Sequence, residues 1–512
     1  MAVRGAPRQM KCFNMRLLYV TSEVFPLAKT GGLADVSAAL PAALGEFGID
    51  VRLLIPGYPQ AIDRALNSRT IARLGDILGC GEVQLIAGRL PDSDVPVWLV
   101  DCPALYDRAG GIYQNEDGND WPDNARRFAL LNHVGAVIAL AGGPDRWRPD
   151  IVHSHDWHAG LLPLLLAAAK QRPATVLTIH NLAYQGVFDG TGLEMLGLVD
   201  DPQVASTVEF YGRLSFLKAG IGCADALTTV SPTYAREILT AEYGCGLDGM
   251  LRERADRLMG IMNGVDYRVW GPAVDSHIVA NYTPQRLSGK RACKAAIQEE
   301  LGLEVGSEIP LVAFTSRLAH QKMPDIVLEA LPALLAQGIQ FALVAEGDAD
   351  YAGRFHELAA SHPGRVAVRA YQEPLAHRLL AGADILLHPS RYEPCGLAPI
   401  YAMRYGTVPV VRRSGGMADS VVGAEQKTIQ SGTATGFSFE NPTTGDLIDC
   451  VQRALACYRQ PIAWRRIQSR AMRQDFGWRR SAQAYAELYR TLAVAPSEME
   501  AEDELLPAKL IA

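Results

Sequence analysis

The chain has 512 residues, which is too long for one ordinary hydrophobic core, so we expect two large domains or three smaller ones. Its apolar and charged fractions are typical of soluble globular proteins, and its net charge of −7 argues against a nucleic-acid-binding surface. Nine scattered cysteines without a C-x-x-C pair favour reduced thiols in a cytoplasmic protein over disulfides or a zinc site. The longest apolar run, residues 161–169, is too short to span a membrane.

The first fourteen residues resemble an addition to the domain that follows. They carry Arg4, Arg8 and Lys11 but no apolar segment of the kind that a signal peptide contains. We therefore expect residues 1–14 to form a disordered extension, with the first strand beginning at Met15 or Arg16.

Apolar runs alternate with helical patterns from residue 15 to about residue 260. We expect strands over 16–20, 51–55, 97–101, 151–155, 176–180 and 226–230, and helices over 34–47, 124–141 and 159–170. This alternation predicts a parallel sheet covered on both faces, which binds ligands at the carboxyl ends of its strands. The polar residues that follow the expected strands are Glu23, Lys29, Tyr106, His155, Asp156, Trp157, His158, His180 and Asn181.

A basic turn with two glycines, Lys29-Thr30-Gly31-Gly32, joins the first expected strand to a helix. Such a turn can bind an anion, because glycine lets backbone N–H groups approach an oxyanion and a helix N-terminus adds partial positive charge. A similar turn, Arg413-Ser414-Gly415-Gly416, follows a β-branched run late in the chain. Either turn alone could be an ordinary strand–helix connection, but the duplication favours two similar halves that bind one phosphate-containing ligand.

A turn-rich connection between about 260 and 272 suggests a hinge. After it we expect strands over 311–316, 341–345, 366–371, 385–389 and 408–411, and helices over 324–337, 351–361, 373–381 and 397–405. This is a second doubly wound domain. Three helical patterns follow, the last over 478–492, and the acidic tail 496–512 is expected to be mobile.

Two loops of the second half carry residue types suited to a phosphate and a sugar. Arg317 and Lys322 follow its first strand, where they are either phosphate-binding groups or ordinary surface cations. Glu393 could accept hydrogen bonds from sugar hydroxyls or serve as a carboxylate at a helix N-terminus. Cys395 beside it is more consistent with packing than with a reactive thiol.

Other motifs do not have the context that they require. The spacing of His153, His155 and His158 matches no strong zinc pattern. The G-x-G-x-x-G match at residues 244–249 follows a helical segment and not a strand, which argues against a dinucleotide oxidoreductase. No Walker-type phosphate loop occurs in the sequence.

Several longer stretches together resemble bacterial glycogen synthases and plant starch synthases. They are residues 22–24 with 29–36, Ile55-Pro56-Gly57-Tyr58, His155-Asp156-Trp157-His158, Thr178-Ile179-His180-Asn181, Ser215-Phe216-Leu217-Lys218, Asn263-Gly264-Val265-Asp266, Ser316-Arg317-Leu318, Gln321-Lys322 and residues 389–397. The resemblance covers roughly residues 15–490.

The resemblance implies the two-domain α/β fold called GT-B, in which two Rossmann-like domains face each other across a deep cleft. It implies an acceptor-side domain over 15–262, a nucleotide-sugar donor domain over 263–477, and a crossing helix over 478–495 that packs on the first domain. The implied enzyme is a retaining glucosyltransferase that moves glucose from ADP-glucose to the 4-hydroxyl end of glycogen or a maltodextrin. It needs no metal ion or other cofactor, and it has neither a nucleic-acid nor a membrane partner. The sequence leaves its oligomeric state open.

The resemblance also implies roles for individual residues. The implied catalytic residues are Arg317, Lys322, His180, Glu393 and Asp156, of which Arg317 and Lys322 stabilise the leaving diphosphate and the others, with Asn263, hold glucose. Lys29, Gly31 and Gly32 would contact the diphosphate, Tyr371 the adenine and Tyr106 the acceptor. The remaining implied substrate-binding residues are Glu23, Asp35, Asn181, Cys395, Gly396, Leu397, Gly415 and Gly416.

Three positions depart from the family pattern. Met323 stands where glycine is usual, Ala398-Pro399 replaces Thr-Gln, and Glu346 places an extra carboxylate at the end of a strand. A related transferase with another nucleotide donor or a small acceptor, and a catalytically weak glucan-binding protein, therefore remain alternatives.

Overall fold

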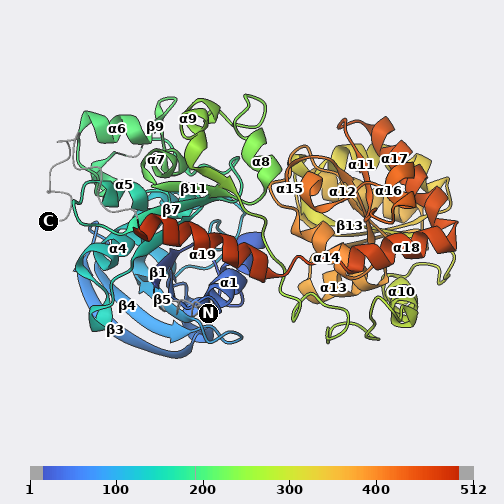
Figure 1. Ribbon diagram of the computed structural model, residues 1–512, viewed down its shortest axis with the longest axis horizontal. Helices are drawn as coiled ribbons and strands as arrows, with labels where there is room; N and C mark the ends of the chain where they lie inside the picture. The colour runs from blue at the N-terminus through green and yellow to red at the C-terminus, as the bar shows by residue number, and fades with distance from the viewer. Residues whose placement is uncertain (1–14, 191, 495–512) are drawn as a thin grey trace, which may run out of the picture. The chain divides into compact units, whose positions relative to one another are not determined.

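The computed structural model describes residues 15–190 and 192–494, so the expected N-terminal extension and acidic tail lie outside the described residues. Its described residues form two compact units. The first contains residues 15–228, 244–261 and 479–494, and the second contains residues 229–243 and 262–478 (Figure 1). The segment 229–243 thus groups with the second unit, although it lies inside the range expected for the first domain. The domain boundaries stay a prediction.

The first unit is built around a mixed nine-stranded sheet in the order β12-β11-β7-β6-β1-β2-β5-β4-β3. Its strands, with those of a smaller sheet ordered β8-β10-β9, are β1 (Met15–Val20), β2 (Ile49–Pro56), β3 (Leu66–Asp76), β4 (Glu82–Arg89), β5 (Pro96–Asp101), β6 (Ile151–His155), β7 (Ala174–Ile179), β8 (Val187–Phe188), β9 (Glu209–Phe210), β10 (Arg213–Ser215), β11 (Ala226–Thr229) and β12 (Leu258–Gly260). Its helices are α1 (Gly32–Gly45), α2 (Pro59–Arg64), α3 (Pro103–Tyr106), α4 (Asn124–Ala141), α5 (Leu162–Ala167), α6 (Pro202–Val208), α7 (Phe216–Cys223), α9 (Asp248–Glu253) and α19 (Trp478–Val494).

The strand order of this sheet reverses at β1, which pairs in parallel with β2 on one side and with β6 on the other. Such a switch point opens a crevice at the carboxyl ends of the two diverging strands. The expectation of a wholly parallel sheet was wrong at one edge, because β4 pairs antiparallel with both β3 and β5. Most of β3 is exposed, so its sequence has no apolar run that would have indicated a strand.

The second unit has a six-stranded sheet in the order β15-β14-β13-β16-β17-β18, in which every pairing is parallel. Its strands are β13 (Leu311–Leu318), β14 (Gln340–Gly347), β15 (Val366–Ala370), β16 (Ile385–His388), β17 (Val408–Arg412) and β18 (Phe437–Phe439). Its helices are α8 (Pro232–Glu237), α10 (Ser288–Leu301), α11 (Pro324–Leu335), α12 (Ala349–Ser361), α13 (Glu373–Gly382), α14 (Leu397–Arg404), α15 (Gly415–Ser420), α16 (Gln426–Gln430), α17 (Thr444–Tyr458) and α18 (Pro461–Met472). This strand order is that of the Rossmann fold, with its switch point between β13 and β16.

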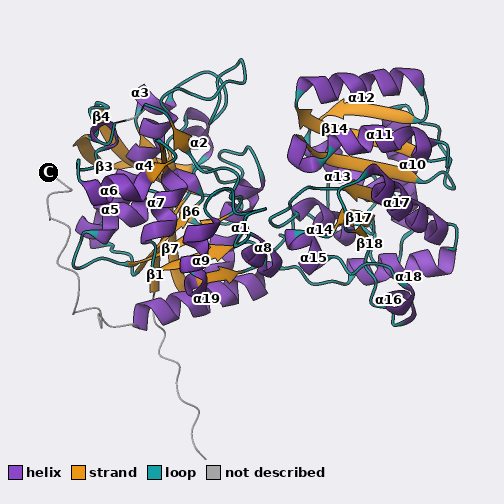
Figure 2. Ribbon diagram, turned by 90° about the horizontal axis from the view of Figure 1, so that it is seen from above, coloured by secondary structure: helices purple, strands orange, loops and turns teal. Residues whose placement is uncertain are grey.

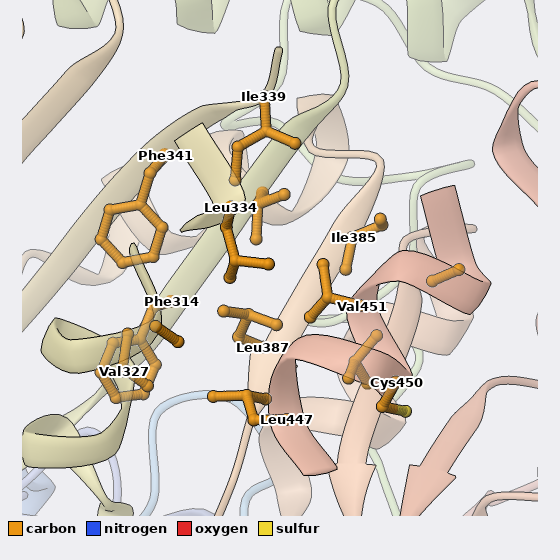
Figure 3. Packing of buried hydrophobic residues seen from close by; sticks show 14 of the residues in the cluster. Phe314, Val327, Leu334, Ile339, Phe341, Ile385, Leu387, Leu447, Cys450 and Val451 are labelled. Carbon is orange, nitrogen blue, oxygen red and sulfur yellow. The ribbon is translucent and has the colours of Figure 1, made fainter. Parts of the chain in front are cut away.

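Helices flank the parallel strands of the second unit (Figure 2). On one face, Phe314 from β13 and Leu387 from β16 belong to a buried cluster with Val327 of α11 and Leu447 of α17 (Figure 3). Continuous apolar strands of this kind are typical of sheets that are buried on both faces. This packing fixes the strand ends from which the functional loops emerge.

The last described helix, α19, returns to the first unit (Figure 1). Its Tyr485 and Tyr489 are buried, and the Tyr489 hydroxyl lies 2.7 Å from Nδ1 of His153 on β6. The expected two-domain fold with a returning C-terminal helix is therefore confirmed. No helix within residues 15–190 and 192–494 has the length and apolar character needed to cross a bilayer.

Candidate functional site

In the first unit, the basic glycine turn after β1 is closed by a carboxylate from its own chain. Glu23 Oε2 accepts hydrogen bonds from the backbone N–H groups of Thr30 at 2.5 Å and Gly31 at 3.2 Å. Its Oε1 accepts the Tyr113 hydroxyl at 3.2 Å. Burial raises the pKa of Glu23 to about 7, against the effect of the two amides, which favour the charged form. The Glu23 carboxyl group thus already occupies two N–H groups of this turn, including that of Gly31, which the sequence assigns to the diphosphate.

The rest of this turn is open. The Lys29 ammonium lies 2.9 Å from Asp35, which is in the first turn of α1. Gly32 is exposed, and a Cβ atom added at Gly31 would meet no atom within 4 Å. Packing therefore does not require glycine at position 31.

His155, the last residue of β6, and Asp156, which follows it, hold His180 at the end of β7 from two sides. Asp156 Oδ1 accepts the backbone N–H of His180 at 2.7 Å and that of Asn181 at 3.4 Å. Nδ1 of His155 lies 2.9 Å from Nε2 of His180. Asp156 adopts φ 56° and ψ −171°, a region that non-glycine residues seldom occupy and that is often found at functional sites. Burial raises the pKa of Asp156 to about 7 and lowers that of His180 to about 3.

Two other residues discussed in the sequence analysis, the predicted acceptor contact Tyr106 and His153 of the discarded zinc pattern, have internal partners. The Tyr106 side chain is 2% exposed, and its hydroxyl donates to the Arg127 carbonyl at 2.7 Å, so contact with an acceptor would require α3 to move. His153 is bound to Tyr489 and to Thr178. Within the described ranges, no cluster of three His, Cys, Asp or Glu residues could hold a metal ion.

At the switch point of the second unit, three donors converge on one carboxylate oxygen. Oε2 of Glu393 accepts hydrogen bonds from the Lys322 ammonium, from His388 at 3.0 Å and from Ser390 at 2.9 Å. Burial by itself would raise the pKa of Glu393, but the Lys322 charge and the His388 hydrogen bond hold it well below its usual range. This cluster therefore keeps a buried carboxylate ionised beside a cation.

The loop that carries Lys322 is fixed to the loop that carries Glu393. Arg391 binds Asp325 with both guanidinium NH₂ nitrogens, at 3.1 and 2.6 Å, and donates to the His320 carbonyl. Arg317, at the end of β13, is exposed and lies in register with Glu346 of β14. The structure thus places Arg317 among the last residues of β13 and Lys322 in the connection that follows it, with Glu346 beside Arg317.

The backbone at Met323 has a conformation that suits glycine, the residue that the resemblance led us to expect at this position. Its φ of 54° and ψ of 42° are left-handed, a conformation that glycine adopts without steric cost. Here the side chain is fully buried in the core cluster of the second unit. Burial of this side chain compensates for the backbone strain.

The second glycine turn is packed tightly against the Glu393 loop. A Cβ atom at Gly416 would lie 2.0 Å from the Cys395 carbonyl oxygen, and one at Gly415 would lie 2.0 Å from that of Glu393. The Gly416 N–H donates to the Glu393 carbonyl, and the Gly415 N–H donates to the Glu237 carboxylate at 2.9 Å. Both N–H groups therefore have internal partners.

The remaining predicted residues of the second unit surround this junction. Gly396 has a φ of 76° and begins α14 together with half-buried Leu397. Burial raises the pKa of the Cys395 thiol to about 12, and the thiol is hydrogen-bonded to Asn263. Oδ1 of Asn263 is buried with no partner among the described residues. Tyr371 is half-buried at the end of β15.

Both units of the chain match families of known proteins. Residues 16–253 match the starch synthase catalytic domain, and residues 302–471 match the glycosyl transferases group 1 family. The chain is 53% identical to a glycogen synthase of Burkholderia thailandensis over 95% of this chain and 92% of the relative. It is 51% identical to one of Paramagnetospirillum magneticum over 93% of this chain and 98% of the relative.

This chain belongs to the glycogen synthase family of glycosyltransferases. A solved member of the wider starch synthase group has the same fold. It is the catalytic domain of starch synthase IV from Arabidopsis thaliana, bound to ADP and acarbose, with a TM-score of 0.84. It is 30% identical, and the match covers 94% of this chain and 99% of that domain.

The sequence analysis missed several residues whose side chains bind the predicted site residues and hold them in position. His388 and Ser390 bind Glu393, Tyr113 binds Glu23, and His155 binds the ring of His180. The position of His388 at the end of a buried strand, five residues before Glu393, was an available signal. Tyr113 is 90 residues from Glu23 in the chain, and no local pattern links the two.

Proposed function

We propose that this chain transfers glucose from ADP-glucose to the terminal 4-hydroxyl of an α-1,4-glucan, with retention of configuration. The observation that carries the proposal is the Lys322–Glu393 cluster at the switch point of the second unit, because a phosphate ester binds at this position in doubly wound sheets. The names of the relatives support the glucan as the acceptor. The ADP in the solved relative supports the donor nucleotide.

In this proposal, Lys322 and Arg317 stabilise the negative charge that develops on ADP as the glucosyl–phosphate bond breaks. Lys322 forms one half of a buried ion pair, so its ammonium is already positioned and loses little freedom when a second anion arrives. The leaving phosphate oxygen takes the proton of the attacking 4-hydroxyl on the same face of the sugar. No side chain is then needed as the base.

The sugar and acceptor contacts are assigned by the same proposal. Asp156, His180, Asn263 and Glu393 hold the glucosyl group, and Tyr371 stacks with the base. Lys29, with the open turn at Gly31 and Gly32, contributes to diphosphate binding. The buried Oδ1 of Asn263 supports its role, because a buried polar atom without a partner favours a ligand that supplies one. We also propose a cytoplasmic location, as the reduced cysteines suggest.

The position of Glu346 beside Arg317 favours one second candidate, a transferase of the same fold with a different nucleotide donor. An extra carboxylate near the donor site weakens the attraction of any nucleoside diphosphate, and it can also accept hydrogen bonds from the base or ribose, which is the way in which it would change the nucleotide preference. The donor assay described next separates the two candidates.

The deciding measurement is ADP release from ADP-glucose with glycogen, beside reactions with UDP-glucose and without acceptor. We expect glycogen-dependent release from ADP-glucose. Release only from UDP-glucose would support the second candidate. Glycogen binding without release from either donor would contradict both.

We predict that Lys322→Ala lowers kcat by roughly 100-fold or more, because it removes a preorganised cation from the leaving group. Lys427→Ala is the matched control, since Lys427 is an exposed lysine of the same unit on α16. Thermal unfolding of both variants reports on stability. A Lys322→Ala variant that keeps near-normal turnover would refute the assigned role.

A further inference from the structure

His155 has no role in the proposed function, yet its side chain contacts a residue that does. It is the last residue of β6 and is fully buried. Its ring stacks on Tyr19 with a centroid distance of 3.9 Å and lies 4.0 Å from the ring of His153. These contacts fix the orientation of the imidazole, so its nitrogen atoms point in defined directions.

The two nitrogen atoms of His155 have different surroundings. Nδ1 lies 2.9 Å from Nε2 of His180, whereas Nε2 is buried and has no hydrogen-bond partner in the part of the chain that the structure describes. Burial keeps the pKa values of both histidines well below their usual range, so both rings are neutral at pH 7. A single proton therefore lies between them, and it is covalently bound to one of the two nitrogens.

The absence of a partner for Nε2 of His155 within the described residues decides which of the two facing nitrogens carries the proton. If His180 donated through Nε2, then His155 would have its own proton on its Nε2, which would be a buried N–H without an acceptor. If His155 donates through Nδ1, its Nε2 is only an unused lone pair. Buried N–H groups without an acceptor are rarer in proteins than acceptors that lack a donor.

We infer that His155 is a positioning residue that fixes the tautomer of His180, so that His180 presents an Nδ1–H donor to its ligand. Nε2 of His180 accepts from His155 and is occupied. Nδ1 of His180 has no protein partner within the described residues, and the residue is half-buried. His180 would therefore donate a hydrogen bond to an oxygen of the ligand, without acting as an acid or a base.

The backbone of His180 is fixed by the residue next to His155. The side-chain Oδ1 of Asp156, whose backbone has the strained conformation described above, accepts hydrogen bonds from the N–H groups of His180 and Asn181. Two consecutive residues thus hold the two ends of His180, its main chain and its ring. This preorganisation is what a directed hydrogen bond to a sugar hydroxyl requires.

The tautomer can be tested without any ligand. In protein labelled with ¹⁵N-histidine, we expect the His180 signals to show a protonated Nδ1 and an unprotonated Nε2, assigned by their loss in His180→Asn. In His155→Phe, which keeps an aromatic ring, His180 loses its partner and we expect a mixture of tautomers. A wild-type spectrum with the proton on Nε2 of His180 would overturn the inference.

A second arm measures transfer and rests on the proposed function. The amide nitrogen of asparagine lies near the position of Nδ1, and that of glutamine lies near the position of Nε2. We expect kcat/KM of His180→Asn to exceed that of His180→Gln by about 10-fold, the value of one hydrogen bond. The reverse order would contradict an Nδ1 donor. If no variant or wild-type protein transfers glucose, the proposed function fails while the spectrum still decides the tautomer.

Thr178→Val is the matched control in the same buried cluster. It removes a hydrogen bond to Nε2 of His153 and leaves the His155–His180 pair intact. We expect unchanged His180 signals and a kcat/KM within threefold of wild type. A shift of the His180 tautomer in Thr178→Val as large as that in His155→Phe would show that general loosening, and not the His155 hydrogen bond, sets the tautomer.

Discussion

At the scale of single residues, Met323 shows how one position can violate a local rule and still suit the fold. Its left-handed backbone costs on the order of 1 kcal/mol relative to glycine. Burial of its side chain stabilises the fold by more than that, since truncation of a core methionine lowers the free energy of unfolding by about 2–5 kcal/mol. Methionine at this position therefore accepts backbone strain that glycine would not have, and it gains side-chain burial in the core.

We predict that Met323→Gly lowers the free energy of unfolding of the second unit by about 1–3 kcal/mol, even though it restores the family's usual residue. Urea or thermal unfolding measures this loss. Asn67→Gly is the control, because Asn67 has a similar φ of 55° but is exposed. It should change stability by less than about 0.5 kcal/mol. Higher stability of Met323→Gly than of wild type would show that strain outweighs burial.

At the scale of elements, the two glycine turns differ in a way that their similar sequences conceal. The turn at Gly31 precedes α1 with free space around it, whereas the turn at Gly416 precedes α15 in contact with the backbone of residues 393–395. A side chain at Gly416 must displace main-chain atoms, which cannot yield as a flexible side chain can. One turn therefore needs glycine for packing, and the other does not.

We predict that Gly416→Ala lowers the free energy of unfolding by about 3 kcal/mol or more, or prevents folding, while Gly31→Ala stays within about 0.5 kcal/mol of wild type. Circular dichroism during thermal unfolding compares the two. If Gly31→Ala keeps its stability but binds ADP less tightly, glycine is needed there for a ligand. Equal destabilisation by both substitutions would contradict the difference in packing.

A buried lysine connects α10 to the end of α13. Lys290 donates to Thr407 at 2.7 Å and to the Ala381 carbonyl at 3.1 Å, and it forms no ion pair with a carboxylate of residues 15–190 or 192–494. Burial lowers the pKa of Lys290 to about 7. Between pH 7 and the ordinary lysine pKa, the unfolded chain holds one more proton than the folded chain. The free energy of unfolding therefore rises with pH across this range.

We predict that raising the pH from 7 to 10 stabilises the wild type relative to Lys290→Met by up to about 4 kcal/mol. The measurement is the difference between the two proteins in denaturant midpoint at several pH values. Other groups titrate in both proteins, so only this difference reports on Lys290. Parallel curves over the whole range would mean that the lysine keeps its ordinary pKa when folded.

The sequence predicted the buried elements well and the exposed ones poorly. The strand over 151–155 and the helix over 124–141 agree with β6 and α4, because long apolar patterns define them. Exposed β3 and three-residue β18 have no such pattern. Among the site residues, the sequence placed Lys322 and Glu393 at strand ends, but their ion pair depends on two loops that meet only in the folded sheet. The roles assigned to these residues remain predictions.

At the scale of the whole molecule, each unit has its own buried core, and the chain passes between the units at residues 228–229, 243–244, 261–262 and 478–479. The final passage delivers α19, whose Tyr489 completes a hydrogen-bond network with His153 and Thr178. Residues far apart in the sequence therefore contribute to the same core.

We predict that Tyr489→Phe lowers the midpoint of the unfolding transition of the first unit, with a loss of about 1–3 kcal/mol, because Nδ1 of His153 loses its partner. Tyr405→Phe, which removes a buried hydroxyl that binds Asp275, should lower that of the second unit instead. Differential scanning calorimetry measures the unfolding transitions of the two units separately. If both variants lower one shared transition equally, the units unfold as one.

The return of α19 also affects how the protein is made. His153 leaves the ribosome 336 residues before Tyr489, a delay of roughly 17 to 67 seconds at ordinary rates of synthesis. During that interval the first unit lacks the helix that covers part of its core, and apolar surface of this kind favours aggregation. The unit that is translated first is therefore completed last, so its core stays partly uncovered until α19 has been synthesised.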